Sequence, residues 1–253
     1  MSINNSTVKR IAKDVKYIIN NEPSLSSENI YYKHDEENIM KGYALIIGQK
    51  DTPYGYGYYF FEFNYPCNYP FSPPEVKYLT NDGTMRFNPN LYTNGKVCLS
   101  ILNTWAGESW TACQTIYSLL LTISSILCAN PLLNEPGIKD GHDDIKKYNY
   151  LVTYKNVEFA ICKIINVVCF GEENNLNKEH ILIMNKFKTI IIETFTNNKE
   201  KIVEFINSNR IKYDDLINVF NNKKINNLYI NVYNLKFDLD YIKLEKLLLE
   251  IHI

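Results

Sequence analysis

Four short runs of residues rich in β-branched and aromatic side chains alternate with turns that contain Asp, Pro and Gly. The runs cover residues 30–33, 43–48, 58–64 and 76–79. Such runs at short intervals favour strands that pair with their neighbours in the sequence. We therefore expect a four-stranded antiparallel meander.

Apolar residues with helical spacing predict helices on either side of this meander. The first predicted helix follows Thr7 and ends at Pro23, with Ile11 and Ile18 on its apolar face. A buried helix is expected at residues 115–129, and another begins near residue 150. Strands grouped between helices are typical of an α+β fold.

The loop before the fourth strand contains four prolines, which forbid regular strand pairing there. Tyr69–Pro70 is a candidate cis peptide bond, because an aromatic–proline pair in a tight turn favours that isomer. Phe71 lies between prolines, and we expect it to stay exposed.

Cys98 lies at the end of a segment with two turns, Asn88-Pro89-Asn90 and Asn94-Gly95. Pro89 disfavours helix at Asn88, so the segment is expected to be an irregular loop with the thiol at the surface, beside side-chain amides. A thiol near preorganised hydrogen-bond donors suits acyl transfer through a thioester. The alternative is a small buried apolar residue, as most free cysteines are.

Bulk properties exclude several classes of function. The chain has 253 residues and a formal net charge of −1, which argues against a nucleic-acid-binding protein. The apolar stretch at residues 117–129 is too short and polar to span a bilayer, and no signal peptide is recognised. We expect a soluble cytoplasmic or nuclear protein. The six cysteines and four histidines show no zinc-binding spacing, so we expect neither a metal nor a cofactor.

The segment Phe87-Asn-Pro-Asn-Leu-Tyr-Thr-Asn-Gly-Lys-Val-Cys-Leu-Ser-Ile-Leu102 resembles the active-site signature of the ubiquitin-conjugating enzymes. In that family a His-Pro-Asn turn lies eight positions before the cysteine, and Asn88 stands here where most members have His. Residues 65–76, 104–110 and 129–137 resemble further family motifs in the same order. The resemblance covers roughly residues 5–165. The combination is similar to a large subclass that carries a C-terminal helical extension.

The resemblance implies the ubiquitin-conjugating fold and a transferase. Such an enzyme accepts ubiquitin or a ubiquitin-like protein from an activating enzyme as a thioester, here on Cys98. It then transfers the modifier to a substrate lysine, usually with a ubiquitin ligase. Asn90 is expected to stabilise the oxyanion, or to brace the loop, or both. Asn88 is expected to be structural. Ser100, Asn134 and Glu135 remain alternatives for orienting the lysine.

Partner-binding residues are also implied by the resemblance. Lys9, Arg10 and Lys13 lie on the first helix, which contacts the activating enzyme in the family. Phe71 and Trp110 match the groove that ligases bind. The alternatives are a solvated helix face and, for Trp110 in particular, a side chain that caps the core.

The composition shifts toward Asn, Lys and Ile beyond Gly171. We therefore expect a conjugating core at residues 5–170 and a helical extension at residues 171–253. Apolar residues recur with helical spacing at residues 179–207 and 238–251. Because such apolar faces must be buried, we expect the extension to pack on the core.

Two rival functions come from other classes. One is a non-catalytic variant of the same fold that binds ubiquitin, but such variants typically lose the cysteine, which is present here. The other is a cysteine hydrolase, whose thiol needs a histidine base. The Cys98 motif contains no histidine.

Overall fold

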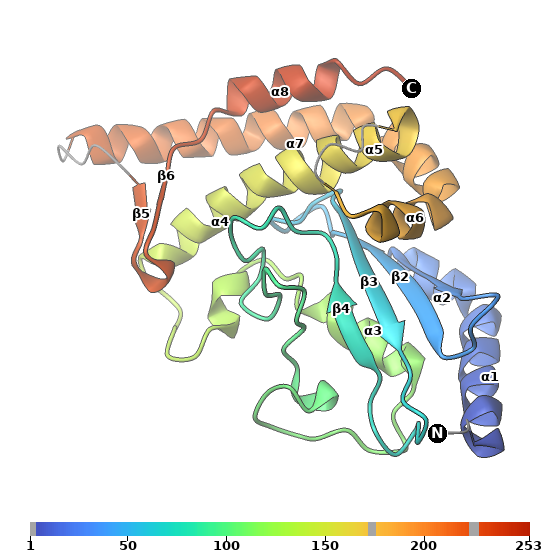
Figure 1. Cartoon of the computed structure of the whole chain (residues 1–253). Helices are drawn as coiled ribbons and strands as arrows, with labels where there is room; N and C mark the ends of the chain where they lie inside the picture. Colours follow the sequence, from blue (N-terminus) through green and yellow to red (C-terminus); the bar gives the residue numbers. More distant parts are fainter. Residues whose placement is uncertain (1–3, 172–175, 223–227) are drawn as a thin grey trace. The chain divides into compact units, whose positions relative to one another are not determined.

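The computed structural model describes residues 4–171, 176–222 and 228–253 (Figure 1). The chain forms two compact units. The first contains Met1–Ile47 and Tyr59–Leu127, and the second contains Gly48–Tyr58 and Cys128–Ile253. The border between these units does not coincide with the boundary expected near Gly171, and that domain assignment stays a prediction.

The four expected strands form one sheet in chain order, β1-β2-β3-β4. Their bounds are Ile30–His34 for β1, Lys41–Ile47 for β2, Tyr58–Asn64 for β3 and Glu75–Tyr78 for β4. β1 pairs antiparallel with β2, and β3 pairs antiparallel with β4. The predicted meander and the α+β class are confirmed, with strand ends shifted by two residues or fewer.

The first helix, α1 (Asn5–Asn20), is capped by Asn4, whose side chain accepts a hydrogen bond from Ser6 N. Thr7, Ile11 and Ile18 are buried along one face, at the spacing that an amphipathic helix requires. The helix ends before Pro23, which lies instead in the first turn of α2 (Glu22–Ser27). Proline is tolerated there because the first helical N–H groups have no partner within the helix.

The buried helix expected after the active-site segment is α3 (Ile116–Ser125). Thr115 and Ser118 cap it reciprocally, each side chain bonding the main-chain N–H of the other residue. Its buried apolar face contributes to the core of the first unit.

The second unit contains a long helical path of three parts. α4 (Asp144–Lys155) continues into a π-helical segment (Asn156–Lys163) and then into α5 (Ile164–Phe170). α4 begins earlier than the expected residue 150. Gly171 ends α5 with a φ of 69°, the left-handed conformation that glycine adopts without steric cost.

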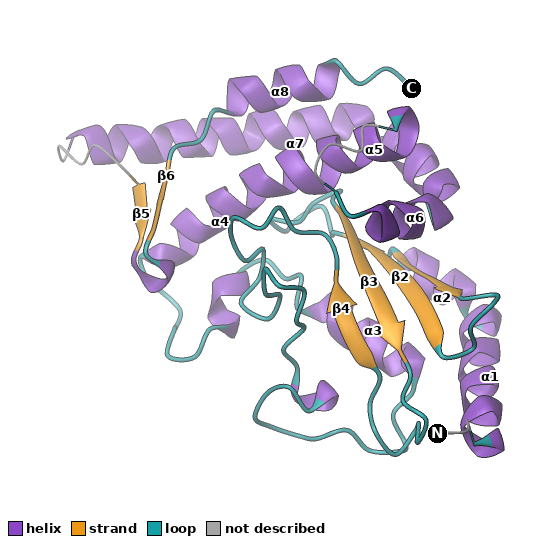
Figure 2. Ribbon diagram, viewed as in Figure 1, coloured by secondary structure: helices purple, strands orange, loops and turns teal. Residues whose placement is uncertain are grey.

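The remaining elements are α6 (Lys178–Lys186), α7 (Lys188–Asn222) and α8 (Tyr241–Leu249). α8 runs alongside α7 (Figure 1), and α7 also contacts α4 and α5. A short antiparallel hairpin, β5 (Leu228–Ile230) with β6 (Leu235–Phe237), precedes α8 and is visible in Figure 2. Helical structure was expected at residues 179–207 and 238–251, but the break between α6 and α7, the extension of α7 to Asn222 and the hairpin were not.

Tertiary contacts within the second unit join the loop before β3 to the C-terminal helices. The Tyr58 hydroxyl donates to the Ile191 carbonyl over 3.2 Å, and the rings of Tyr56 and Phe205 meet edge to face. The Asn156 amide donates to the Gly55 carbonyl over 2.8 Å. Residues 48–58 are therefore held by elements that lie far from them in the sequence.

Candidate active site

Cys98 lies in an extended segment of the first unit, just before a short 3-10 helix at Ser100–Leu102. Its main-chain N–H donates to the Asn90 carbonyl over 2.8 Å. The residue is only 3 % exposed, and its Sγ donates a hydrogen bond to the Thr104 carbonyl over 3.0 Å. The expectation of a surface thiol is therefore wrong: the side chain is buried, and its sulfur contacts the main chain of Thr104.

The side chain of Asn90 forms a hydrogen bond with the main chain of Cys98. Its Nδ2 donates to the Cys98 carbonyl over 2.7 Å. Its Oδ1 is buried and has no hydrogen-bond partner among the described residues. The bracing interaction is thus present in this structure, and the amide retains a second hydrogen that it can donate.

Asn88, which stands where the family usually has His, is completely buried. Its Nδ2 donates to the Ile126 carbonyl over 2.7 Å, and its Oδ1 accepts from Asn90 N over 2.9 Å. Asn88 therefore ties the Asn-Pro-Asn turn to the C-terminal end of α3, which is the structural role expected from the sequence.

The segment after Cys98, residues 103–110, forms a loop whose two ends are joined. The Trp110 N–H donates to Asn103 Oδ1 over 3.0 Å, and Asn103 adopts a left-handed conformation with a φ of 55°. Gly107 has a φ of 135°, where a side chain would be strained. Trp105 near the tip is 47 % exposed.

Phe71 and Trp110, both expected to bind a ligase, differ sharply in exposure. Phe71 is 78 % exposed, whereas Trp110 is 7 % exposed and its indole N–H donates to the Pro70 carbonyl over 2.7 Å. The Tyr69–Pro70 bond is cis, as predicted. Trp110 thus supports the loop that presents Phe71, and the role of either side chain in partner binding stays a prediction.

The three basic residues predicted on the first helix also divide into two kinds. Lys9 and Lys13 are exposed. Arg10 bonds Asp14 through Nε over 3.0 Å, and its Nη1 and Nη2 donate to the carbonyls of Ala112 and Gln114 over 2.8 and 2.5 Å. The structural role of Arg10 was missed, although Asp14 four residues later was a signal for it.

A partly buried polar cluster formed by two β1 residues and Tyr65 was also missed. The Tyr32 hydroxyl lies 2.8 Å from His34 Nδ1 and 2.9 Å from the Tyr65 hydroxyl, and His34 Nε2 lies 3.0 Å from the Ile39 carbonyl. Burial lowers the pKa of His34, against the opposing effects of the Ile39 carbonyl and the Asp35 charge. Burial likewise raises the pKa of Tyr32.

The three alternatives for orienting a lysine lie in different surroundings. Ser100 is half-buried in the 3-10 helix, next to Gly107. Asn134 ends a short 3-10 helix of the second unit, and the neighbouring Glu135 accepts a hydrogen bond from the Tyr233 hydroxyl. The choice among them stays a prediction.

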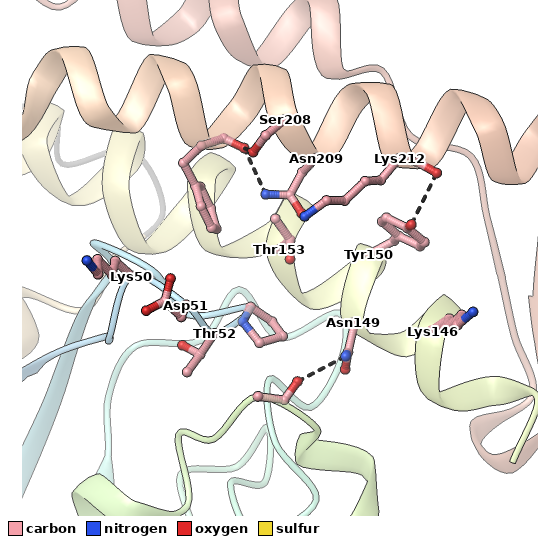
Figure 3. A pocket seen from close by; sticks show the side chains of 13 residues that line it. Lys50, Asp51, Thr52, Lys146, Asn149, Tyr150, Thr153, Ser208, Asn209 and Lys212 are labelled. Atoms are coloured by element: carbon pink, nitrogen blue, oxygen red, sulfur yellow. Dashed lines mark hydrogen bonds between the residues drawn. The ribbon is translucent and has the colours of Figure 1, made fainter. Parts of the chain in front are cut away.

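Each of the two units has a cavity among its described residues. One, of about 530 Å³ in the first unit, is lined by residues that include Val97, Thr104, Pro73 and Pro74. The other, of about 470 Å³, lies within the second unit (Figure 3).

The second-unit cavity is lined by polar side chains of mixed charge. Lys50 and Lys146 extend away from its centre, whereas Lys212 lies beside Asn209 (Figure 3). The Tyr150 hydroxyl donates to the Lys212 carbonyl over 3.1 Å. Its described lining residues include neither cysteine nor histidine, so this cavity offers no thiol chemistry.

Across residues 4–171, 176–222 and 228–253, no cluster of His, Cys, Asp and Glu side chains is arranged to hold a metal ion. In the same residues, no helix has both the length and the apolar character needed to cross a bilayer.

Comparison with known proteins places Cys98 and its surroundings in a family. The model of the ubiquitin-conjugating enzyme family matches residues 10–157, more than half of the chain. The chain is 40% identical to ubiquitin-conjugating enzyme E2 Z of Xenopus tropicalis over 168 residues, which is 65% of this chain and 52% of that protein. It is also 40% identical to the human protein of the same name over 163 residues, 63% of this chain and 45% of that protein.

A probable ubiquitin-conjugating enzyme of Acanthamoeba polyphaga mimivirus is 32% identical over 231 residues. That match covers 85% of this chain and 16% of the viral protein. The chain thus spans about half the length of the first relatives or less. The matched segment includes the four-stranded sheet, the Asn-Pro-Asn turn and Cys98, and the chain belongs to the ubiquitin-conjugating enzyme family.

Proposed function

We propose that this chain accepts ubiquitin or a ubiquitin-like protein as a thioester on Cys98 and transfers it to a substrate lysine. One observation carries the proposal: Cys98 lies inside the segment that matches the family and is bonded to the side chain of Asn90. The thiol supplies the nucleophile, and the amide supplies a donor beside the reacting carbonyl.

The first step is an exchange between two sulfur atoms. Cys98 Sγ forms a bond to the C-terminal carbonyl carbon of the modifier, and the bond from that carbon to the sulfur of the activating enzyme breaks. The proton that leaves Cys98 Sγ is balanced by the proton that the released thiol takes up. This exchange requires neither a metal ion nor a cofactor.

In the second step the ε-amine of a lysine attacks the thioester carbonyl, and negative charge develops on its oxygen. The second amide hydrogen of Asn90 can be donated to that oxygen while the first remains on the Cys98 carbonyl. Collapse of the intermediate breaks the bond to Sγ and forms an amide. The proton lost by the amine is taken up as the Cys98 thiol is restored.

The partners follow from the same proposal. Exposed Lys9 and Lys13 on α1 suit an activating enzyme, and exposed Phe71 suits a ligase. Trp110 contributes by holding the Pro70 carbonyl that precedes Phe71. Residues 171–253 are proposed to select among activating enzymes, modifiers or ligases; their described part contains no group of His, Cys, Asp and Glu side chains that could hold a metal ion.

The test is incubation of the purified chain with an activating enzyme, ATP and ubiquitin, or a ubiquitin-like protein. We expect one added modifier that is released by a thiol reductant. Cys98→Ala should carry none, and Cys98→Ser should carry at most an adduct that resists reductant. Full loading of Cys98→Ala would disprove the assignment. Binding of modifier without any adduct would identify a non-catalytic variant instead.

A further inference from the structure

Thr104 contacts the main chain on both sides of Cys98. Its Oγ1 accepts from the Leu99 N–H over 2.9 Å and lies within hydrogen-bond distance of the carbonyls of Val97, at 2.8 Å, and Leu99, at 3.1 Å. A hydroxyl has one hydrogen, so it donates to one of these carbonyls at a time. The main-chain N–H of Thr104 also donates to the Leu99 carbonyl, over 3.2 Å.

The same residue also holds the thiol. The Thr104 carbonyl accepts the hydrogen bond from Cys98 Sγ over 3.0 Å. The carbonyl contact thereby restricts rotation of the thiol, and the hydroxyl contacts restrict the backbone on either side of Cys98. A single residue six positions along the chain therefore sets both the path of residues 97–99 and the direction of the S–H bond.

These contacts respond differently to the chemistry of the sulfur. The carbonyl contact requires a thiol hydrogen, so it is lost when Sγ is ionised or acylated. The hydroxyl contacts involve only main-chain atoms of Val97 and Leu99, so they do not depend on the state of Sγ.

We propose that Thr104 is a positioning residue for loading of Cys98, an inference that rests on the proposed function. In the resting enzyme its carbonyl covers the sulfur and holds the thiol hydrogen. During loading that contact breaks, and the hydroxyl keeps residues 97–99 extended so that Sγ meets the incoming carbonyl in a fixed orientation.

The loop around Thr104 is built so that this contact can open. Trp105 is 47 % exposed, and residues 106–109 are exposed, so little apolar surface holds the loop down. The Asn103–Trp110 hydrogen bond closes the ends of the loop. Rotation of the peptide between Thr104 and Trp105, with movement of residues 105–109, therefore takes the Thr104 carbonyl off Sγ while the hydroxyl contacts and the hydrogen bond of Trp110 are kept.

The experiment compares Thr104→Val, which removes the hydroxyl at nearly constant shape, with Thr104→Ser, which keeps it. Thr122→Val is the matched control, because its hydroxyl donates to the Ser118 carbonyl within α3. Two rates are measured on the full chain. The first is alkylation of Cys98 by iodoacetamide, followed by peptide mass spectrometry. The second is thioester formation, separated into kcat and KM for the loaded activating enzyme.

Exposed Cys67 and Cys113 serve as internal references for alkylation, and buried Cys162 reports loss of the fold. Without the hydroxyl contacts the Thr104 carbonyl is no longer fixed over Sγ. We therefore expect Thr104→Val to alkylate at Cys98 about tenfold faster and to load with a kcat about tenfold lower at unchanged KM, the scale of losing about one net hydrogen bond. Thr104→Ser and Thr122→Val should match wild type in both rates.

The proposal would be overturned if Cys98 of Thr104→Val were alkylated at the wild-type rate. It would also be overturned if Thr104→Val and Thr104→Ser lost loading equally. If Thr104→Val reacts at Cys162 and is therefore unfolded, Thr104→Ser decides, because the proposal requires that it load at the wild-type rate. If the wild-type chain fails to load at all, the proposed function fails, and the alkylation rates alone still support or reject the hold of Thr104 on the thiol.

Discussion

The side-chain amide of Asn90 donates a hydrogen bond of 2.7 Å to the main-chain carbonyl of Cys98. Asn90 is expected to stabilise the thioester carbonyl during transfer. In this structure it already donates a hydrogen bond to a different carbonyl, the main-chain carbonyl of Cys98, eight positions along the chain. One amide hydrogen holds the loop and the other is available for the oxyanion. Bracing and catalysis are therefore compatible roles for this side chain.

Asn90→Ala should still accept the modifier but should discharge it to free lysine about 10²-fold more slowly, the scale of losing one oxyanion donor. Asn90→Asp is the matched variant, because an ionised carboxylate keeps the shape but cannot donate. Single-turnover discharge and thermal melting measure the two roles. If Asn90 only braces the loop, loading and melting temperature will fall together; a wild-type discharge rate removes it from catalysis.

Phe71→Ala should melt near wild type, because the side chain is 78 % exposed. It should load normally and lose ligase-stimulated transfer. Trp110→Ala should instead cost about 3–5 kcal/mol in the free energy of unfolding, as truncation of a buried aromatic does. Leu182→Ala, which truncates an exposed apolar residue on α6, is the control for a nonspecific effect. Unchanged ligase stimulation in Phe71→Ala would contradict the assignment.

Substitutions of Arg10 and Lys13 should distinguish a basic residue of α1 that stabilises the fold from one that binds a partner. Arg10→Ala removes a cation that bonds Asp14 and two carbonyls, so we expect a loss of roughly 1–3 kcal/mol in unfolding free energy. Lys13→Ala should keep wild-type stability and raise the KM for the activating enzyme, increasingly so at low ionic strength. Denaturant unfolding and loading kinetics check both. A salt-independent KM in Lys13→Ala would argue for a merely solvated lysine.

His34 should make the fold less stable in mild acid. Its folded pKa is lowered by burial below its ordinary value of 6.5, so in that window the unfolded state binds more protons. Stability therefore falls as the pH drops through about 6.5 toward the folded pKa. His34→Gln lacks the titration, and its unfolding free energy should fall less between about pH 8 and about pH 5. Parallel curves for the two proteins would contradict this expectation.

Removal of residues 171–253 tests the role of the extension. We expect residues 1–170 to form the thioester while the preference among activating enzymes and modifiers changes. The truncation also removes Ile191 and Phe205, the partners of Tyr58 and Tyr56. Aggregation must therefore be controlled for by size-exclusion chromatography and melting. An unchanged preference in a folded truncation would reduce the extension to structural support.

The strands and the cis bond at Tyr69–Pro70 were predictable because turn residues and prolines act locally. The burial of Cys98 was not, because the residue that covers it, Thr104, follows it in the sequence and reaches it only through the fold. Trp110 was ambiguous for a similar reason, since its indole N–H bonds the carbonyl of Pro70, which is distant in the sequence. The β5–β6 hairpin has strands of three residues each, too short to show an alternating pattern.

The π-helical segment Asn156–Lys163 contains the point, residue 157, at which the match to the family ends. The family match thus ends inside a helix and not in a linker, since α4, this segment and α5 follow one another without interruption from Asp144 to Phe170. In an α-helix each inserted residue turns everything beyond it by about 100°. A π-helical turn takes up an extra residue without breaking the helix. A cut at residue 157 would therefore sever a continuous helix, with residues on both sides of the cut still packed in the fold, instead of parting two pieces at a linker.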